Sequence, residues 1–346
     1  MTELPRNIIL VGDAATRLRE LPRASVDCVI TSPPYYALRN YGHDDQLGLE
    51  ATVDDWVTGL LPVFRELSPV IKPTGSVWLN LGDSFSRHAK YGAPPKSLLL
   101  APERLILALS ADGWIVRNKV IWAKTNPMPS SIQDRLTLTY EVVYFLARSP
   151  RYFFDLDAIR EPHRSGGGKA AAKADYARPT YRGPLAASNE GLRRERPPGQ
   201  PGHPLGKNPG DVWQLAAANF RGSHFATFPP GLVRRPLLAT CPEAVCTACG
   251  QSWKRRYTVR QMWSAKDQEM RTVREPGDFI RCGCEAPTVP GIVADPFFGT
   301  GTVGAVACEN RRDWLGVELN PEYVKLAEDR LRTACGPPEE VAACAA

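Results

Sequence analysis

The sequence predicts an α/β fold in which a doubly wound, mostly parallel sheet is covered by helices on both faces. Short apolar runs alternate along the chain with segments whose apolar residues recur at helical spacing, which is the pattern of such sheets. Several of the runs end abruptly in Gly, Pro or Asp, as buried strands do where they pass into loops. The 346 residues favour one large domain with insertions over two equal domains.

The N-terminal part supplies most of the expected elements. The apolar run 7–11 ends in Gly12-Asp13, and the run 26–30 ends in a Thr-Ser-Pro-Pro segment, so both are expected to be buried strands. A helix with regularly spaced apolar residues follows and stops at Lys72-Pro73-Thr74-Gly75. In chain order we expect strands 7–11 and 26–30, helix 54–71, strand 76–81, helix 102–111 and strands 115–122 and 142–146.

The alternation stops between Arg160 and Gly222 and returns afterwards. Fifteen of the 48 residues 160–207 are Gly or Pro, and this stretch has ten Lys and Arg against four Asp and Glu. It therefore holds the whole formal charge of +6 and is expected either to face a polyanion or to be a solvated basic linker. Beyond it we expect helix 230–238, a Cys-rich module over 241–284, strands 291–294 and 314–317 and helix 321–332.

Composition restricts where the protein works. No apolar run approaches the roughly 20 residues that span a bilayer, and the first residues lack a signal segment, so we expect a cytoplasmic protein without a membrane partner. In that reducing compartment the nine cysteines are expected to be thiols or metal ligands rather than disulfides. Cys28 and Cys308 lie in apolar context and are expected in the core, and the five histidines show no metal-ligand spacing.

A glycine turn follows the expected strand 291–294. Gly299 and Gly301 precede a helix, and such a turn lets the backbone and the free N–H groups of the helix approach a ligand closely. No Lys follows the glycines, so this is not a phosphate-binding P-loop. Glu318 ends the next strand, where an acidic residue would accept hydrogen bonds from a ribose diol. This pattern favours a nucleotide-like cofactor over a plain turn beside a solvated Glu.

The segment Thr31-Ser32-Pro33-Pro34-Tyr35 follows the expected strand 26–30, at the sheet edge where α/β proteins bind ligands. The two prolines remove N–H donors and leave carbonyl acceptors in a stiff loop. A ring amine that is to be methylated needs such acceptors, because its lone pair is delocalised into the ring. Ser32 and the Pro33 carbonyl are candidates, and Tyr35 is a candidate to stack on a base that has left the duplex. The alternative is a Pro-rich turn with a core Tyr.

Taken together, these two motifs resemble the amino-group DNA methyltransferases of the permuted β class, in which the catalytic motif precedes the cofactor motif along the chain. The resemblance covers most of the chain outside residues 160–210 and the Cys-rich module. It rests on the segments 9–13, 32–35, 78–83, 225–229, 295–302 and 316–321.

The resemblance implies that S-adenosylmethionine lies over the switch point of a seven-stranded sheet. Methyl transfer would be a direct in-line displacement with no covalent enzyme intermediate, and positioning would supply much of the rate. Glu318 would bind the ribose hydroxyls, Asp13 would approach the adenine, and Asp295 with the glycine turn would hold the methionine part. The implied cofactor residues are Asp13, Phe225, Thr227, Phe228, Asp295, Phe297, Gly299, Gly301, Thr302 and Glu318, and the implied catalytic residues are Ser32, Pro33, Pro34 and Tyr35.

The resemblance leaves the target amine open between cytosine N4 and adenine N6. Family members with Ser at the first position of the tetrapeptide are often cytosine-N4 enzymes, whereas Asp or Asn is commoner among adenine-N6 enzymes. Ser32 therefore favours cytosine, with adenine as the alternative. Methylation at cytosine C5 needs a cysteine nucleophile, typically in a Pro-Cys dipeptide, and this chain contains none.

The Cys-rich module has metal-ligand spacing. Cys246 and Cys249 form a C-x2-C knuckle, and Cys282 and Cys284 supply two more thiols about 33 residues later. Four thiolates suit a closed tetrahedral zinc site, so a structural Zn²⁺ is expected. Cys241 is a possible substitute ligand because the second pair is C-x-C. The alternative is a set of reduced surface cysteines.

These interpretations divide the chain into six parts: a catalytic half over 1–159, a target-recognition insertion over 160–222, a cofactor-pocket helix over 223–240, the zinc module over 241–290, a cofactor-binding half over 291–334 and a tail over 335–346. Duplex DNA is the expected partner, with Arg193, Arg194 and Arg196 available for guanine edges or phosphates. The sequence leaves open whether the protein is a monomer or a homodimer. Two other hypotheses are an inactive zinc-ribbon DNA-binding protein and a methyltransferase acting on RNA or a protein amide.

Overall fold

A computed structural model describes residues 5–39, 45–162, 203, 205–218, 228–264 and 269–335, and the structural statements below concern these residues. The chain forms two compact units. The first comprises Met1–Asp155, Gly210–Lys254 and Phe279–Ala346, and the second comprises Leu156–Pro209 and Arg255–Asp278. Within the described residues no helix is both long enough and apolar enough to cross a membrane.

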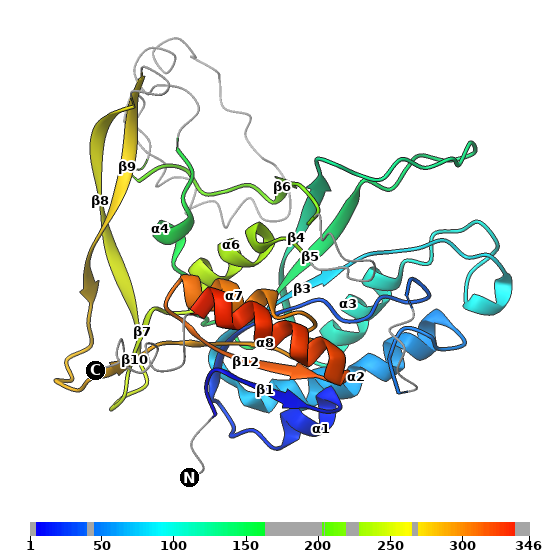
Figure 1. Ribbon diagram of the computed structural model, residues 1–346, viewed down its shortest axis with the longest axis horizontal. Helices are drawn as coiled ribbons and strands as arrows, with labels where there is room; N and C mark the ends of the chain where they lie inside the picture. The colour runs from blue at the N-terminus through cyan, green and yellow to red at the C-terminus, as the bar shows by residue number, and fades with distance from the viewer. Residues whose placement is uncertain are drawn as a thin grey trace, which may run out of the picture. The chain divides into compact units, whose positions relative to one another are not determined.

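An eight-stranded sheet forms the centre of the first unit, in the order β1-β12-β11-β2-β3-β5-β4-β6 (Figure 1). Every neighbouring pair is parallel except those made by β5, which runs antiparallel to both β3 and β4. The predicted mostly parallel sheet is therefore confirmed. The strands are β1 (Ile8–Val11), β2 (Val26–Thr31), β3 (Ile71–Leu81), β4 (Ile115–Lys124), β5 (Tyr140–Ala147), β6 (Val212–Leu215), β11 (Ile292–Asp295) and β12 (Asp313–Glu318).

The sheet has eight strands, so the expected count of seven was wrong. The additional strand is β6, at one edge of the sheet. This strand pairs in parallel with β4, with Ile121 opposite Val212 and Lys124 opposite Leu215. It is held by burial of Trp213, whose ring centroid lies 5.9 Å from that of Trp78. An extended segment that follows a Pro- and Gly-rich stretch has no strand signature of its own, so only the pairing with β4 defines it.

Helices cover both faces of the sheet, as predicted (Figure 1). On β2, Val29 packs into one core, whereas its neighbours Cys28 and Ile30 pack into the other, as the alternation of a strand requires. The first core contains residues of α1 (Ala14–Arg19), α2 (Val53–Val70) and α3 (Ala101–Ala111), and the second contains residues of α6 (Pro230–Thr240), α7 (Thr302–Glu309) and α8 (Pro321–Cys335). The six-residue helix α1 was not predicted.

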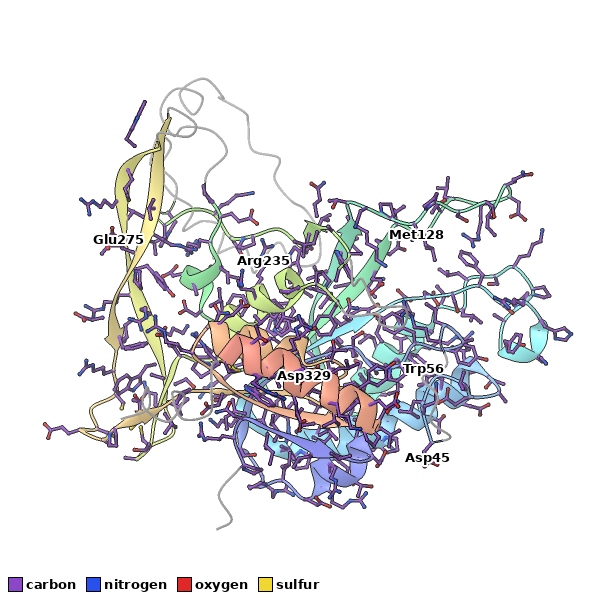
Figure 2. All side chains as sticks on the ribbon, in the orientation of Figure 1. Asp45, Trp56, Met128, Arg235, Glu275 and Asp329 are labelled. Carbon is purple, nitrogen blue, oxygen red and sulfur yellow. A yellow bond between two sulfur atoms is a disulfide. The ribbon has the colours of Figure 1, made fainter. Side chains whose placement is uncertain are left out.

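The start of α2 is specified by local chemistry. The Thr52 hydroxyl accepts a hydrogen bond from the Asp55 backbone N–H, and the Asp55 carboxylate accepts one from the Thr52 N–H. This reciprocal capping box satisfies N–H groups that have no partner inside the helix. Trp56, labelled in Figure 2, lies in the first turn of α2 and is fully buried in the first core of the large sheet.

A second sheet, in the order β10-β7-β8-β9, contains the Cys-rich module. Its strands are β7 (Ala244–Cys246), β8 (Ser252–Ser264), β9 (Glu269–Ile280) and β10 (Thr288–Val289), none of which was predicted individually. The second unit contains α4 (Leu156–Ile159) and the parts of β8 and β9 between Arg255 and Asp278. The remaining short element is the 3₁₀ helix η1 (Ala89–Tyr91) of the first unit.

One disulfide contradicts the expectation that all cysteines are thiols or metal ligands. Cys308 and Cys335 are bonded, with their Cα atoms 5.2 Å apart. Cys308 lies in α7 and Cys335 is the last residue of α8, and these two helices pack against each other. Their pairing is decided by helix packing, which composition and compartment cannot reveal. Cys28 is buried in the core, as expected, whereas Cys308 is only partly buried.

Candidate active site

The carboxyl ends of four parallel strands lie side by side although they are far apart in the sequence. Strand β11 pairs with β2 on one side and with β12 on the other, and β12 pairs with β1. The residues at or just after these ends are Asp13, Thr31, Asp295 and Glu318. The topology thus gathers the two predicted motifs at one edge, where open α/β sheets bind their ligands.

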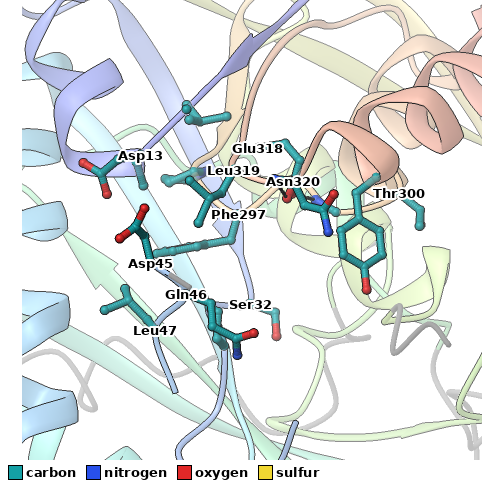
Figure 3. A pocket seen from close by; sticks show the side chains of 17 residues that line it. Asp13, Ser32, Asp45, Gln46, Leu47, Phe297, Thr300, Glu318, Leu319 and Asn320 are labelled. Carbon is teal, nitrogen blue, oxygen red and sulfur yellow. Dashed lines mark hydrogen bonds between the residues drawn. The ribbon is translucent and has the colours of Figure 1, made fainter. Parts of the chain in front are cut away.

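A cavity opens at this edge and is lined by both motifs (Figure 3). Asp13, Ser32 and Glu318 all line it, together with Phe297 and Gly299 of the glycine turn. Asp45, Gln46, Leu47 and Tyr323 also line the cavity and were not predicted. They come from a loop before α2 and from the first turn of α8, and neither segment has a sequence pattern that marks a ligand site.

Left-handed backbone at two positions explains the glycine turn. Gly299 has a φ of +53° and Gly301 a φ of +75°, a region that L side chains rarely adopt. A Cβ added at Gly299 would have no atom within 4 Å, whereas one at Gly301 would lie 3.1 Å from the Ala327 Cβ. The first glycine thus opens the backbone toward the cavity, and the second lets α7 start close to α8.

Glu318 is tied to the glycine turn from the neighbouring strand. Its Oε2 accepts a 2.7 Å hydrogen bond from the Gly299 N–H, and its Oε1 accepts one of 2.9 Å from the Asn320 N–H. The side chain lines the cavity although it is only 9 % exposed. A carboxylate oriented in this way can accept further hydrogen bonds from hydroxyl groups of a ligand.

Asp295 lies behind the cavity wall. Its Oδ1 accepts hydrogen bonds from the Thr31 hydroxyl at 2.6 Å and from the Phe297 N–H at 3.0 Å. Burial raises the pKa of Asp295 to about 7, although both hydrogen bonds act to lower it. Its carboxyl group therefore links the end of β2, just before the Ser-Pro-Pro-Tyr segment, to the residues just before the glycine turn.

The predicted cofactor residues do not all line the cavity. Asp13, Phe297, Gly299 and Glu318 do, whereas Asp295, Gly301 and Thr302 are not among its lining residues. The Thr302 hydroxyl instead accepts a 2.7 Å hydrogen bond from Arg330. Phe228 lines a second, adjoining cavity. Phe225 and Thr227 lie outside the described residues, as do Arg193, Arg194 and Arg196.

The Ser-Pro-Pro-Tyr segment separates the two cavities. Ser32 lines both, Pro34 lines the first, and Pro33 and Tyr35 line the second. The indole N–H of the buried Trp56 donates a 2.9 Å hydrogen bond to the Pro34 carbonyl, which fixes the segment against α2.

The wall of the second cavity carries charged groups that were not predicted. Glu141 accepts a 2.8 Å hydrogen bond from the Tyr35 hydroxyl and another of 2.8 Å from the Asn80 amide. Its other oxygen lies 2.6 Å from the Lys124 ammonium group, which in turn lies 5.0 Å from the Trp122 ring centroid. The sequence signal that could have pointed to this site is the charged residue Glu141 near the start of the otherwise apolar strand β5.

Four thiols meet in the Cys-rich module. The sulfur atoms of Cys246, Cys249, Cys282 and Cys284 all lie within 4.8 Å of one another. The Trp253 indole N–H points at Cys282 Sγ at 3.3 Å. Cys241 is not part of this group but is buried in the second core of the large sheet. The predicted four-cysteine set is therefore brought together, and the substitute ligand is not.

Comparison with known proteins agrees with this geometry. Residues 26–329 match the N6_N4_Mtase family model, described as DNA methylase. The type II methyltransferase M.XycI of Xanthomonas campestris pv. cyanopsidis is 34 % identical over 342 residues, which cover 93 % of this chain and 86 % of that protein. M.Cfr9I of Citrobacter freundii is 32 % identical over 351 residues, with coverages of 95 % and 89 %.

Solved structures show the same fold. The cytosine-N4-specific PvuII DNA methyltransferase has a TM-score of 0.58 and 17 % identity, covering 98 % of this chain and 91 % of that one. A putative DNA modification methylase from Thermus thermophilus, complexed with S-adenosyl-L-methionine, has a TM-score of 0.50 and 20 % identity, with 95 % of each chain covered. Since the family model spans most of the chain and the sequence relatives match it almost end to end, this protein belongs to the N6/N4 DNA methylase family.

Proposed function

We propose that this protein transfers the methyl group of S-adenosylmethionine to the exocyclic N4 amine of cytosine in duplex DNA, as the modification enzyme of a type II system. The observation that carries the proposal is that Ser32 lines both adjoining cavities. One cavity has groups suited to a nucleoside with a charged tail, and the other has groups suited to a flat polar ring. A methyl donor and an amine acceptor can therefore meet at Ser32.

The first cavity fits S-adenosylmethionine by its donors and acceptors. Glu318 supplies an oriented carboxylate for the ribose hydroxyls, and the open backbone at Gly299 permits close approach of the ligand. Phe297 adds an apolar surface, and Asp13 places a carboxylate at the first turn of α1. When bound, the sulfonium compound supplies an activated methyl group. Asp295 supports this wall from behind by holding the Phe297 N–H.

The second cavity fits a base that has left the duplex. Tyr35, Trp122 and Phe228 supply aromatic surface for stacking, while Asn80 and Glu141 supply polar groups for the base edge. We assign Ser32 and the Pro33 carbonyl as acceptors for the two N–H groups of the target amine. Holding both of them turns the nitrogen lone pair out of the ring toward the methyl carbon. Pro34 keeps the segment stiff, and Trp56 fixes its carbonyl.

Cytosine N4 is favoured over adenine N6 by Ser32 at the head of the tetrapeptide, where the resemblance associates Asp or Asn with adenine. A hydroxyl is a weaker acceptor than a carboxylate, and the cytosine amine needs less assistance. The alternative target is adenine N6. Recognition of the DNA sequence is assigned to the basic insertion 160–222, most of which lies outside the described residues.

One experiment tests the reaction and the base together. The purified protein is incubated with isotopically labelled S-adenosylmethionine and mixed-sequence duplex DNA, and the digested nucleosides are identified by mass spectrometry. We expect labelled N4-methylcytosine. Labelled N6-methyladenine would overturn the choice of base, and label in RNA or protein but not in DNA would overturn the substrate. Absence of S-adenosylmethionine binding by calorimetry would favour an inactive DNA-binding protein. Modification-sensitive sequencing of an expressing host then gives the recognition site.

We also propose that the four thiols of Cys246, Cys249, Cys282 and Cys284 bind a structural Zn²⁺. A tetrahedral site with Zn–S bonds of about 2.3 Å places its sulfur atoms about 3.8 Å apart. Sulfur atoms that all lie within 4.8 Å of one another approach this arrangement. Cys246 and Cys249 precede β8, and Cys282 and Cys284 follow β9. The ion would therefore tie the start of β8 to the end of β9. The Trp253 N–H would stabilise the thiolate of Cys282.

A further inference from the structure

We propose that Ser32, Tyr35 and Glu141 form a proton relay that removes the proton of the target amine when its nitrogen is methylated. The inference rests on the methyl transfer proposed above and adds an acceptor for the proton. When the amine nitrogen forms a bond to the methyl carbon it becomes positively charged. It must then lose one N–H proton to give the neutral methylated base.

The relay is a directed chain of hydrogen bonds. The Ser32 hydroxyl donates to the Tyr35 hydroxyl at 3.0 Å, and the Tyr35 hydroxyl donates to Glu141 Oε2 at 2.8 Å. The amide nitrogen of Asn80 also donates to the Tyr35 hydroxyl. A phenol hydroxyl has a single proton, and the groups from Ser32 and Asn80 occupy its acceptor side. The proton of the Tyr35 hydroxyl therefore points to Glu141, away from Ser32 and Asn80.

Glu141 is placed to receive a proton. Its Oε1 is held 2.6 Å from the Lys124 ammonium group, which leaves Oε2 for Tyr35 and Asn80. The Glu141 and Lys124 side chains are 16 % and 25 % exposed, so this end of the proton relay reaches the solvent. The relay thus begins at Ser32, which lines both cavities, and ends at a carboxylate from which the proton can leave.

Every proton and electron pair in the step is accounted for. The nitrogen lone pair forms the new bond to the methyl carbon while the carbon–sulfur bond breaks and its electron pair goes to sulfur. The amine proton moves to Ser32 Oγ, the Ser32 proton moves to Tyr35, and the Tyr35 proton moves to Glu141. The positive charge of the sulfonium and the negative charge of the carboxylate cancel. The products are a neutral thioether, a neutral methylated amine and a protonated Glu141.

The sheet topology explains how these residues meet. Glu141 is the second residue of β5, which is antiparallel, and Lys124 is the last residue of β4. The start of an antiparallel strand lies at the same edge as the ends of its parallel neighbours, so Glu141 faces the carboxyl edge. A Cβ at Gly82 would lie 2.7 Å from the Tyr35 ring, so glycine there leaves the room that the ring needs to reach Glu141.

The test compares two conservative variants by single-turnover methyl transfer. Tyr35→Phe keeps the stacking ring and removes the relay hydroxyl, and Glu141→Gln keeps the shape and removes the proton acceptor. For each protein the rate is measured between pH 5 and 9 with saturating S-adenosylmethionine and duplex DNA. We expect each variant to lose about 10²-fold in rate, the scale of general base catalysis. We expect the double variant to be no slower than the slower single variant.

The pH profile separates a relay from a merely structural network. The rate profiles of the wild type and of Glu141→Gln should differ in shape, because only the wild type has a carboxylate at this position that can accept the proton. Glu103→Gln is the matched control, because Glu103 also pairs with a lysine, Lys119 at 2.6 Å, and a tyrosine, Tyr144 at 3.3 Å, outside both cavities. It should keep the wild-type rate and profile.

Several results would overturn the relay. They are a Glu141→Gln variant with the wild-type rate and profile, additive losses in the double variant, or losses explained entirely by weaker binding of S-adenosylmethionine or DNA. Binding is measured on the same preparations by calorimetry, and folding by thermal unfolding. A wild-type protein that transfers no methyl group would contradict the proposed function itself, which distinguishes the two failures.

Discussion

The Thr31 hydroxyl donates a 2.6 Å hydrogen bond to Asp295 Oδ1, although the two residues are 264 positions apart in the chain. They end two adjacent parallel strands, β2 and β11. The residue after Thr31 is Ser32 of the Ser-Pro-Pro-Tyr segment, and the residues after Asp295 form the glycine turn. This buried bond therefore sets the position of the proposed amine site relative to the proposed methyl-donor site.

The stability of the protein without ligand should depend on the ionisation of Asp295. Burial raises its pKa to about 7, from about 4 in an unfolded chain. Between these values the folded protein keeps a proton that the unfolded chain has lost, so the free energy of unfolding falls as the pH rises through this window. Asp295→Asn should abolish this contribution, which is on the order of 4 kcal/mol. Urea unfolding of both proteins between pH 4.5 and 8 measures it.

The expected signature is a difference between the two proteins that grows from pH 4.5 to 7 and then levels off. A difference that does not change with pH would contradict the raised pKa. Thr31→Val supplies a second check. The Thr31 hydrogen bond lowers the pKa of Asp295, so its loss should move the upper end of the window above pH 7.

Gly82→Ala should slow methyl transfer without affecting binding of the methyl donor. The added methyl group would lie 2.7 Å from Tyr35 Cε2 and 2.9 Å from Cδ2, so the ring must move. A displacement of about 1 Å at a catalytic group costs about 10²-fold in rate. Gly210→Ala is the control, because an added Cβ there has no atom within 4 Å. Single-turnover rates and calorimetry test the pair, and equal rates would refute the role of the Tyr35 ring position.

Glu318→Gln should weaken binding of S-adenosylmethionine. Hydrogen bonds to a charged acceptor contribute about 1.5–3 kcal/mol each, so the loss should be roughly ten- to a hundredfold in Kd. Calorimetry with the purified protein measures the change. Glu328→Gln, at an exposed position on α8, should bind as the wild type does. An unchanged Kd in Glu318→Gln would remove this residue from the binding site.

Metal analysis should find one zinc ion per chain, and its removal should leave methyl-donor binding intact. Cys249→Ser should lower the zinc content because it removes one of four ligands. Cys241→Ala should keep one zinc per chain, because Cys241 is buried in the core of the large sheet. Mass spectrometry of the native protein and calorimetry after chelation provide the two measurements. Zinc content that is independent of Cys249 would refute the site.

The N-terminal strands show how much local sequence can predict. The expected strand 26–30 is β2, and the expected helix 54–71 is α2, within one residue at each end. Both succeed because the period of apolar residues records which face is buried. The same patterns place Ser32 and Glu318 at strand ends. The four-cysteine set was predictable for another reason. The two cysteines of each pair are close together in the sequence, so the covalent chain itself keeps their thiols near each other.

Contacts between distant segments were decided by the tertiary structure. Glu141 lines the second cavity because β5 runs antiparallel, and an apolar pattern has the same period in either direction. The strand β6 and the bond between Cys308 and Cys335 likewise depend on neighbours that the local sequence does not specify. The sequence by itself determined the fold class, the family and the two motifs. Only the packing of the strands determined which charged groups surround Tyr35 and how Asp295 is buried beside Thr31.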